Sequence, residues 1–250
     1  MTSRLLIALL ALATLVLSGC ASTSPKADPF ESINRATYKF NDVVDKAVLT
    51  PVAKGYQAVT PEFVRTGISN VFSNIGDVAT AFNNLLQGKG EDAANDVGRV
   101  LLNSTFGLFG LIDIATPGGL EKHHEDFGQT LGKWGVGSGP YLVLPIIGPS
   151  TLRDGPARVV DSYAGYFRYI DHIPTRNTTF GVEMVDLRAS LLGASSTLDT
   201  AALDKYQFVR DAYLQRRLNQ VYDGKVPQAL KDKLEDDLEP PSKPAAPEKK

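Results

Sequence analysis

Apolar residues recur every three or four positions over much of the chain, which is the spacing of one face of an α-helix. The first such pattern begins after Asp28 and Pro29, which suit a helix cap and the first helical position, and Glu31 adds an acidic first turn. Its apolar stripe comprises Ile33, Ala36, Thr37, Phe40, Val43, Val44, Ala47 and Val48. This segment is predicted to form an amphipathic helix.

Similar patterns continue to the end of the chain and predict a series of further helices. They cover Thr60 to Ile75, Asp77 to Gln87, Glu91 to Thr105, Pro156 to Ile170, Thr175 to Leu192, Asp204 to Tyr222 and Gln228 to Leu238. Strand patterns are weak throughout. We therefore expect an all-α fold, a single domain of amphipathic helices spanning residues 28–239.

The helix from Thr175 differs from the others because it has two apolar stripes and little polar surface. Phe180 and Leu187 belong to one stripe, and Val182 and Val185 to the other. Such a helix fits either the centre of a protein core or a surface in contact with lipid.

The first nineteen residues have the three zones of a secretory signal: Arg4, an apolar stretch from Leu5 to Leu17, and small residues before a cysteine. The apolar stretch is shorter than the roughly twenty residues that span a bilayer, so cleavage is expected. The run Leu17-Ser18-Gly19-Cys20 is typical of a lipoprotein cleavage site, which predicts lipidation of Cys20. Ala21 follows it, which favours the outer membrane over retention at the inner membrane.

Cys20 is the only cysteine of the chain, so the mature protein has no internal disulfide and no cysteine-based metal site. Residues 20–27 are small and polar and predict a flexible tether between anchor and body. Residues 240–250 contain four prolines and three lysines, and we expect a disordered tail that aids solubility or touches anionic lipid or the cell wall.

Charge and hydropathy narrow the class of protein further. Without Arg4 the mature chain has 25 Lys and Arg against 28 Asp and Glu, a balance that does not suit nucleic acid as a partner. The longest apolar run of the mature chain, Tyr141 to Ile147, is too short to cross a bilayer as a helix. The body is therefore expected to associate with a membrane without spanning it.

Two glycine-rich segments interrupt the helical pattern. The first, Asn103 to Asp113, alternates large apolar residues with glycine, and the second runs from Phe127 to Arg153. Each large apolar side chain left in water forgoes about 1.5 to 3 kcal/mol of burial. These segments must therefore contact the protein core, membrane lipid or a carried acyl chain.

No set of residues supports catalysis, a cofactor or a metal. Gly135, Gly137 and Gly139 lack the spacing of a dinucleotide loop, and the sequence around Ser150 lacks the second glycine of a lipase nucleophile elbow. Ser150 is better explained as a helix cap or turn residue. His123 and His124 are adjacent and have no evident third ligand, so a solvated loop is expected there.

The second glycine-rich segment carries a distinctive motif. It comprises Phe127-Gly128-Gln129-Thr130-Leu131-Gly132, Trp134-Gly135-Val136-Gly137-Ser138-Gly139-Pro140-Tyr141, Leu144-Pro145 and Gly148-Pro149-Ser150-Thr151-Leu152-Arg153-Asp154. On this motif, with Asp28-Pro29-Phe30-Glu31, Asn34-Arg35, Phe40-Asn41 and residues 103–113, the chain resembles the MlaA (VacJ) family of outer-membrane lipoproteins. The resemblance covers residues 28 to 224.

This resemblance implies an all-helical, ring-like body that lies in the inner leaflet of the outer membrane around an amphipathic channel. It implies removal of phospholipid from the outer leaflet, with a trimeric porin and a soluble periplasmic lipid carrier as partners. We expect the glycine-rich segments to line or gate the lipid path through Asn103, Phe106, Phe109, Leu111, Ile112, Trp134, Tyr141, Leu142 and Leu144. The alternatives are a lipoprotein that scaffolds porins or the cell wall, and a lipid hydrolase that uses Ser150.

Overall fold

The structure is a computed structural model that describes residues 26–239. The predicted signal peptide, Cys20, most of the predicted tether and the predicted tail lie outside the described residues. Ala27, the last residue of the predicted tether, forms backbone hydrogen bonds through both its N–H and its carbonyl. Its N–H donates to the carbonyl of Asp237 at 2.9 Å, and its own carbonyl accepts from Tyr141 N at 2.9 Å.

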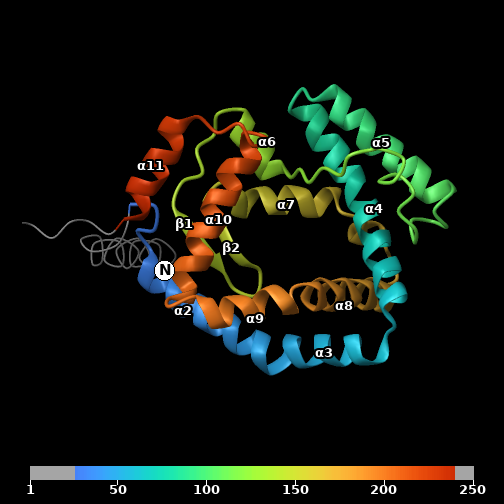
Figure 1. Cartoon of the computed structure of the whole chain (residues 1–250), viewed down its shortest axis with the longest axis horizontal. Helices are drawn as coiled ribbons and strands as arrows, with labels where there is room; N and C mark the ends of the chain where they lie inside the picture. The colour runs from blue at the N-terminus through green and yellow to red at the C-terminus, as the bar shows by residue number, and fades with distance from the viewer. Residues whose placement is uncertain (1–25, 240–250) are drawn as a thin grey trace, which may run out of the picture.

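The described chain is a mostly helical single domain, as the sequence predicts (Figure 1). A π-helical turn, η1 (Asp45–Leu49), joins α2 to α3, and a short 3-10 helix, η2 (Tyr166–Tyr169), follows α7. The α-helices are α2 (Glu31–Val44), α3 (Thr50–Val59), α4 (Glu62–Leu86), α5 (Gly90–Thr105), α6 (Phe127–Lys133), α7 (Asp154–Ala164), α8 (Ile173–Ser190), α9 (Leu192–Ala201), α10 (Lys205–Val221) and α11 (Gln228–Leu238).

The all-α prediction is wrong at one place, a β-hairpin within the second glycine-rich segment. Strands β1 (Tyr141–Leu144) and β2 (Gly148–Thr151) pair antiparallel, with Tyr141 opposite Thr151. The turn between them needs a positive φ at Ile146 and at Gly148, which glycine adopts without strain. Ser150, expected to cap a helix or form a turn, is instead buried on β2.

Three other expectations need correction. Asp28 does not cap the first helix, which begins at Glu31, because its carboxylate is buried and accepts hydrogen bonds from Asn34 Nδ2 (2.8 Å) and from the Tyr206 hydroxyl. The two helices expected between Thr60 and Gln87 are one continuous helix, α4, which runs through Gly76 without a break, since an isolated glycine weakens a helix without ending it. The helices α3, α6 and α9 were not predicted.

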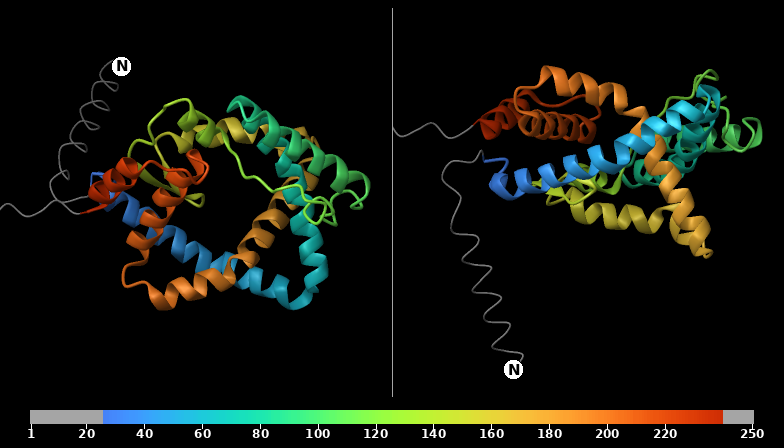
Figure 2. Two further views of the ribbon diagram at one scale, coloured as in Figure 1. Left: turned by 45° about the horizontal axis from the view of Figure 1, so that its top comes forward. Right: turned by 90° about the horizontal axis from the view of Figure 1, so that it is seen from below.

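The helices surround a central space (Figure 1). Helices α3 and α8 lie together along one side, α4 and α7 form the next two, and α10 with the hairpin forms the fourth. Seen from the side, the helices form a flattened body, and the connection between α7 and α8 projects from one face (Figure 2). Within residues 26–239 no helix combines the length and the apolar character needed to cross a membrane.

The apolar core is small and lies where the hairpin meets α10. Tyr141 and Val143 of β1 pack there against Tyr206, Tyr213 and Leu214. The rings of Tyr141 and Tyr206 meet edge to face at 6.2 Å between centroids.

Much of the remaining interior is polar, while many large apolar side chains face outward. The helix from Thr175, observed as α8, follows this rule: its buried residues are Asp186 and Ala189, while Phe180 and Val182 are exposed. The core interpretation of this helix is therefore wrong. Apolar surface on this scale is typical of a protein that meets a membrane or a partner.

Candidate functional site

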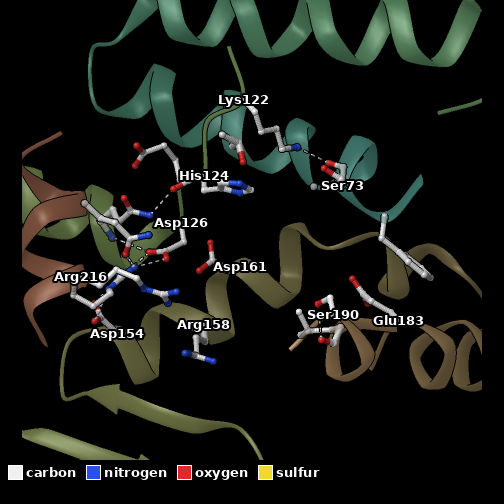
Figure 3. A pocket seen from close by; sticks show the side chains of 18 of the residues that line it. Ser73, Lys122, His124, Asp126, Asp154, Arg158, Asp161, Glu183, Ser190 and Arg216 are labelled. Carbon is white, nitrogen blue, oxygen red and sulfur yellow. Dashed lines mark hydrogen bonds and ion pairs between the residues drawn. The ribbon is translucent and has the colours of Figure 1, made fainter. Parts of the chain in front are cut away.

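An open cavity of about 760 Å³ lies inside the arrangement of helices. Its walls are formed by α4, α6, α7, α8, α10 and the segment 122–126, and the side chains of these elements point toward a common space (Figure 3). The ionisable residues that line it are Lys122, His124, Glu125, Asp126, Asp154, Arg158, Asp161, Glu183, Asp186, Arg216 and Arg217. The interior of the molecule is thus hydrophilic where an ordinary globule is apolar.

Arg217 of α10 binds carboxylates at the N-termini of two helices, α6 and α7, in one wall of the cavity. Its guanidinium donates to both oxygens of Asp126 at 2.6 and 2.9 Å, and Asp126 caps α6 by accepting from Gln129 N at 2.8 Å. The same guanidinium donates twice to Asp154, the first residue of α7, each time at 3.0 Å. Acidic groups at helix N-termini are also stabilised by the helix dipole.

These ion pairs set the charge state of the wall. Burial alone would raise the pKa of Asp154, but hydrogen bonds from Arg217 and Arg153 outweigh it and lower the pKa to about 2. The pKa of Asp126 is lowered in the same way, because bonds from Arg217 overcome the effect of burial. Both carboxylates therefore stay ionised at neutral pH.

The opposite wall is organised by buried polar pairs. Asp186 of α8 accepts from the Tyr56 hydroxyl at 2.9 Å and from Ser69 Oγ at 2.5 Å, which joins α8 to α3 and α4. Glu183, one turn earlier, accepts from the Tyr166 hydroxyl at 3.3 Å, and burial raises its pKa.

A second polar network holds the first glycine-rich segment against α4 and α5. Arg99 is only 2% exposed and binds Asp77 at 3.3 Å, Asp113 at 3.1 Å and the Leu120 carbonyl at 2.8 Å. Asp77 also pairs with Lys122 of the cavity wall. The wall of the cavity and the glycine-rich segment therefore share one network.

Asn103 explains how that segment keeps its shape. It is buried, donates to Asp113 at 3.0 Å, and its Oδ1 accepts from the N–H groups of Ile114 and Ala115 at 2.8 and 2.9 Å. Leu108 and Phe109 have positive φ angles of 52° and 58°, a strained conformation for residues with a Cβ. The result is a rigid loop that presents large apolar side chains.

None of the nine predicted lipid-path residues lines this cavity within the described chain. Phe106 and Phe109 are 72% and 87% exposed on the loop, and Leu111, Ile112 and Trp134 are exposed as well. Leu142 and Leu144 are half-buried, while Asn103 and Tyr141 are buried and serve the loop and the core. The exposed members remain candidates for contact with lipid, and that role stays a prediction.

Sequence reasoning missed the charged lining of the cavity because its residues resemble the ordinary solvated face of a helix. A signal was present in α10, where Tyr206, Arg210, Tyr213 and Arg217 fall at helical spacing on one face and all four are buried. Arginine repeated on a tyrosine face indicates an interior that contains carboxylates.

The two adjacent histidines lie in different surroundings. His123 is partly exposed, and its Nδ1 lies 2.9 Å from an oxygen of Asp96. His124 lines the cavity, and burial lowers its pKa. In residues 26–239 no cluster of three or more potential metal ligands occurs.

A helical body with apolar side chains outside and charged side chains around an open cavity is typical of a membrane-associated protein that handles an amphipathic molecule. Comparison with known proteins agrees. The profile of the MlaA lipoprotein family matches residues 26–220. The chain belongs to the MlaA lipoprotein family, as the motif predicted.

Two curated relatives and one solved structure illustrate the match. Over 248 residues the chain is 34% identical to the intermembrane phospholipid transport system lipoprotein MlaA of Haemophilus influenzae, covering 95% of this chain and 97% of the relative. The Escherichia coli protein of the same name is 35% identical over 221 residues, 85% of this chain and 87% of the relative.

A solved structure described as a structural basis for maintenance of bacterial outer membrane lipid asymmetry has the same fold. It superposes with a TM-score of 0.67 and 36% identity, covering 76% of this chain and 96% of the other.

Proposed function

We propose that this protein is an outer-membrane lipoprotein that removes mislocalised phospholipid from the outer leaflet and so maintains lipid asymmetry. It is a transport lipoprotein and not an enzyme. The observation that carries the proposal is the inverted distribution of polarity, with apolar side chains on the outside and charged side chains around the cavity. A phospholipid has the same two chemical parts, acyl chains and a charged headgroup.

In this mechanism the ring-like body lies in the inner leaflet, anchored through Cys20, and its apolar exterior replaces water with acyl chains. The headgroup passes through the charged cavity, and the acyl chains follow the apolar surface near the loop of Phe106 and Phe109. No covalent step is required. Phospholipid moves because the outer leaflet is the less favourable location for it.

The proposal includes two partners, a trimeric porin that holds the protein in place and a soluble periplasmic carrier that receives the lipid. We expect the two partners to use different surfaces of the flattened body, from one face of which the α7–α8 connection projects (Figure 2). A purely structural scaffold, the alternative function, would not explain an internal cavity with a charged lining.

The test is complementation of a strain that lacks the gene. We expect the wild-type chain to lower phospholipid in the outer leaflet, measured by surface lipid labelling, and Cys20→Ser to fail because the anchor is lost. Ala21→Ser, which leaves the lipidated cysteine in place, is the control. Purified protein without bound phospholipid, together with unchanged surface lipid in the complemented strain, would favour the scaffold.

A further inference from the structure

Two arginines of the cavity have no carboxylate partner in the part of the chain that the structure describes. Arg158 of α7 and Arg216 of α10 both line the cavity, and no Asp or Glu oxygen lies within 4.0 Å of either guanidinium. Arg158 makes one hydrogen bond, to the Pro149 carbonyl at 3.2 Å. Both side chains are exposed, so their charge is available to a ligand.

The other strong cations of the lining are already engaged. Lys122 is paired with Asp77 and donates to the Ser73 carbonyl at 3.1 Å. Arg217 is saturated by Asp126 and Asp154. Anion binding in this cavity therefore falls to Arg158 and Arg216, which come from two different walls (Figure 3).

The carboxylates of the cavity restrict the kind of anion. Asp161, one turn after Arg158, accepts from Phe127 N at 3.0 Å and has no cation within 4.0 Å among the described residues. Glu183 on the facing helix is likewise without a cation within 4.0 Å among the described residues. A multiply charged anion would be repelled by them, whereas a phosphodiester carries a single negative charge.

We propose that Arg158 and Arg216 form the site that binds the phosphodiester of a phospholipid headgroup inside the cavity. The planar guanidinium matches two phosphate oxygens at once, which gives orientation as well as attraction. A cavity of about 760 Å³ accommodates a headgroup, and its opening leaves the acyl chains outside the charged lining. This inference rests on the proposed function and assigns its headgroup-recognition residues.

The experiment is calorimetric titration of the lipidated protein, in a detergent without phosphate, with a short-chain phosphatidylethanolamine. The matched probes are a short-chain diacylglycerol, which lacks the phosphate, and inorganic phosphate, which lacks the chains. Arg158→Gln and Arg216→Gln are each expected to weaken phosphatidylethanolamine binding about tenfold, the size of one lost charged hydrogen bond. Diacylglycerol binding should stay unchanged.

The control is Arg176→Gln, which removes the same charge from α8 at a position that does not line this cavity. It should bind like the wild type, and Arg158→Lys should retain part of the affinity because it keeps the charge. Since both arginines are exposed, the midpoints of thermal unfolding should match and exclude misfolding as the cause.

Equal phosphatidylethanolamine affinity in the wild type and the double Gln variant would overturn the inference and leave the proposed function intact. Inorganic phosphate binding that the double variant loses, with lipid affinity unaffected, would make this a site for free phosphate and also overturn it. A wild-type protein that binds no phospholipid would refute the proposed function itself.

Discussion

The side-chain amide of Asn34 binds the backbone of Tyr141 as a neighbouring strand would. Asn34 Nδ2 donates to the Tyr141 carbonyl at 2.9 Å, and Asn34 Oδ1 accepts from Val143 N at 2.9 Å. Two helical turns later Asn41 repeats the arrangement, donating to the Leu144 carbonyl at 2.9 Å and accepting from Ile146 N at 2.7 Å. Helix α2 thus supports the hairpin along its length and fixes the aromatic core behind it.

Asn34→Ala is expected to lower the free energy of unfolding by about 3 kcal/mol, because it leaves a buried N–H, a carbonyl and one Asp28 oxygen without their partner. Denaturant unfolding of the purified protein in detergent measures this. Asn177→Ala, at an exposed position of α8, is the control and should change stability by less than about 0.5 kcal/mol. Similar values for the two variants would show that the hairpin does not depend on α2.

Acidification should weaken the α6–α7 wall. The pKa of Asp154 is lowered from 3.8 to about 2, so this carboxylate stabilises the fold above pH 3.8, and the contribution is lost as the pH falls through 2. The loss is on the order of 2 kcal/mol. The free energy of unfolding measured between pH 6 and pH 2 should therefore decline, and Asp154→Asn should make that decline smaller. At neutral pH the variant should be less stable than the wild type, because Arg217 loses a partner.

Asp161→Asn is the control for that experiment, because burial shifts the pKa of Asp161 in the opposite direction. Above its raised pKa the buried Asp161 is ionised, which lowers the stability of the folded state. As the pH falls, protonation of this carboxylate removes that cost. The variant should therefore match or exceed wild-type stability at neutral pH and keep the acid-induced decline. An acid profile of Asp154→Asn identical to that of the wild type would contradict the role of the Arg217 cluster.

Helix positions were predictable because apolar periodicity is a local property: α11 was predicted with its observed bounds, and α5 and α10 to within one residue at each end. The hairpin was missed because its strands are four residues long and its support comes from Asn34 and Asn41, more than a hundred residues away. The cavity was missed for a related reason. Whether Asp126 and Arg217 are solvated or paired depends on how α6 and α10 pack, which neither segment encodes alone.

Alanine substitutions at Gly107 and Gly76 test how closely the first glycine-rich segment is packed, with Gly76 in α4 as the comparison. A Cβ on Gly107 would overlap the carbonyl oxygens of Ile112 and Asn103, whereas a Cβ on Gly76 of α4 meets nothing within 4 Å. Gly107→Ala should therefore destabilise the protein by about 2 kcal/mol or more, since backbone must move. Gly76→Ala should stabilise it by about 0.5 to 1 kcal/mol, the helix preference of alanine over glycine. Thermal unfolding compares them, and equal midpoints would mean that the loop is not rigid.

The exposed loop provides a direct test of membrane contact. Phe109 is 87% exposed and has a strained backbone conformation. In water this side chain would contribute no hydrophobic stabilisation, whereas contact with acyl chains would supply it. If Phe109 lies among acyl chains, Phe109→Asp places a charge in the bilayer at a cost of up to about 3 kcal/mol.

We expect this variant to fold, to carry its lipid anchor and to leave elevated phospholipid in the outer leaflet when it replaces the wild-type chain, as surface lipid labelling reports. Gln215→Asp, which adds the same charge at an exposed polar position of α10, should complement fully. Full complementation by Phe109→Asp would remove the loop from the lipid path and leave the charged cavity as the element that carries transport.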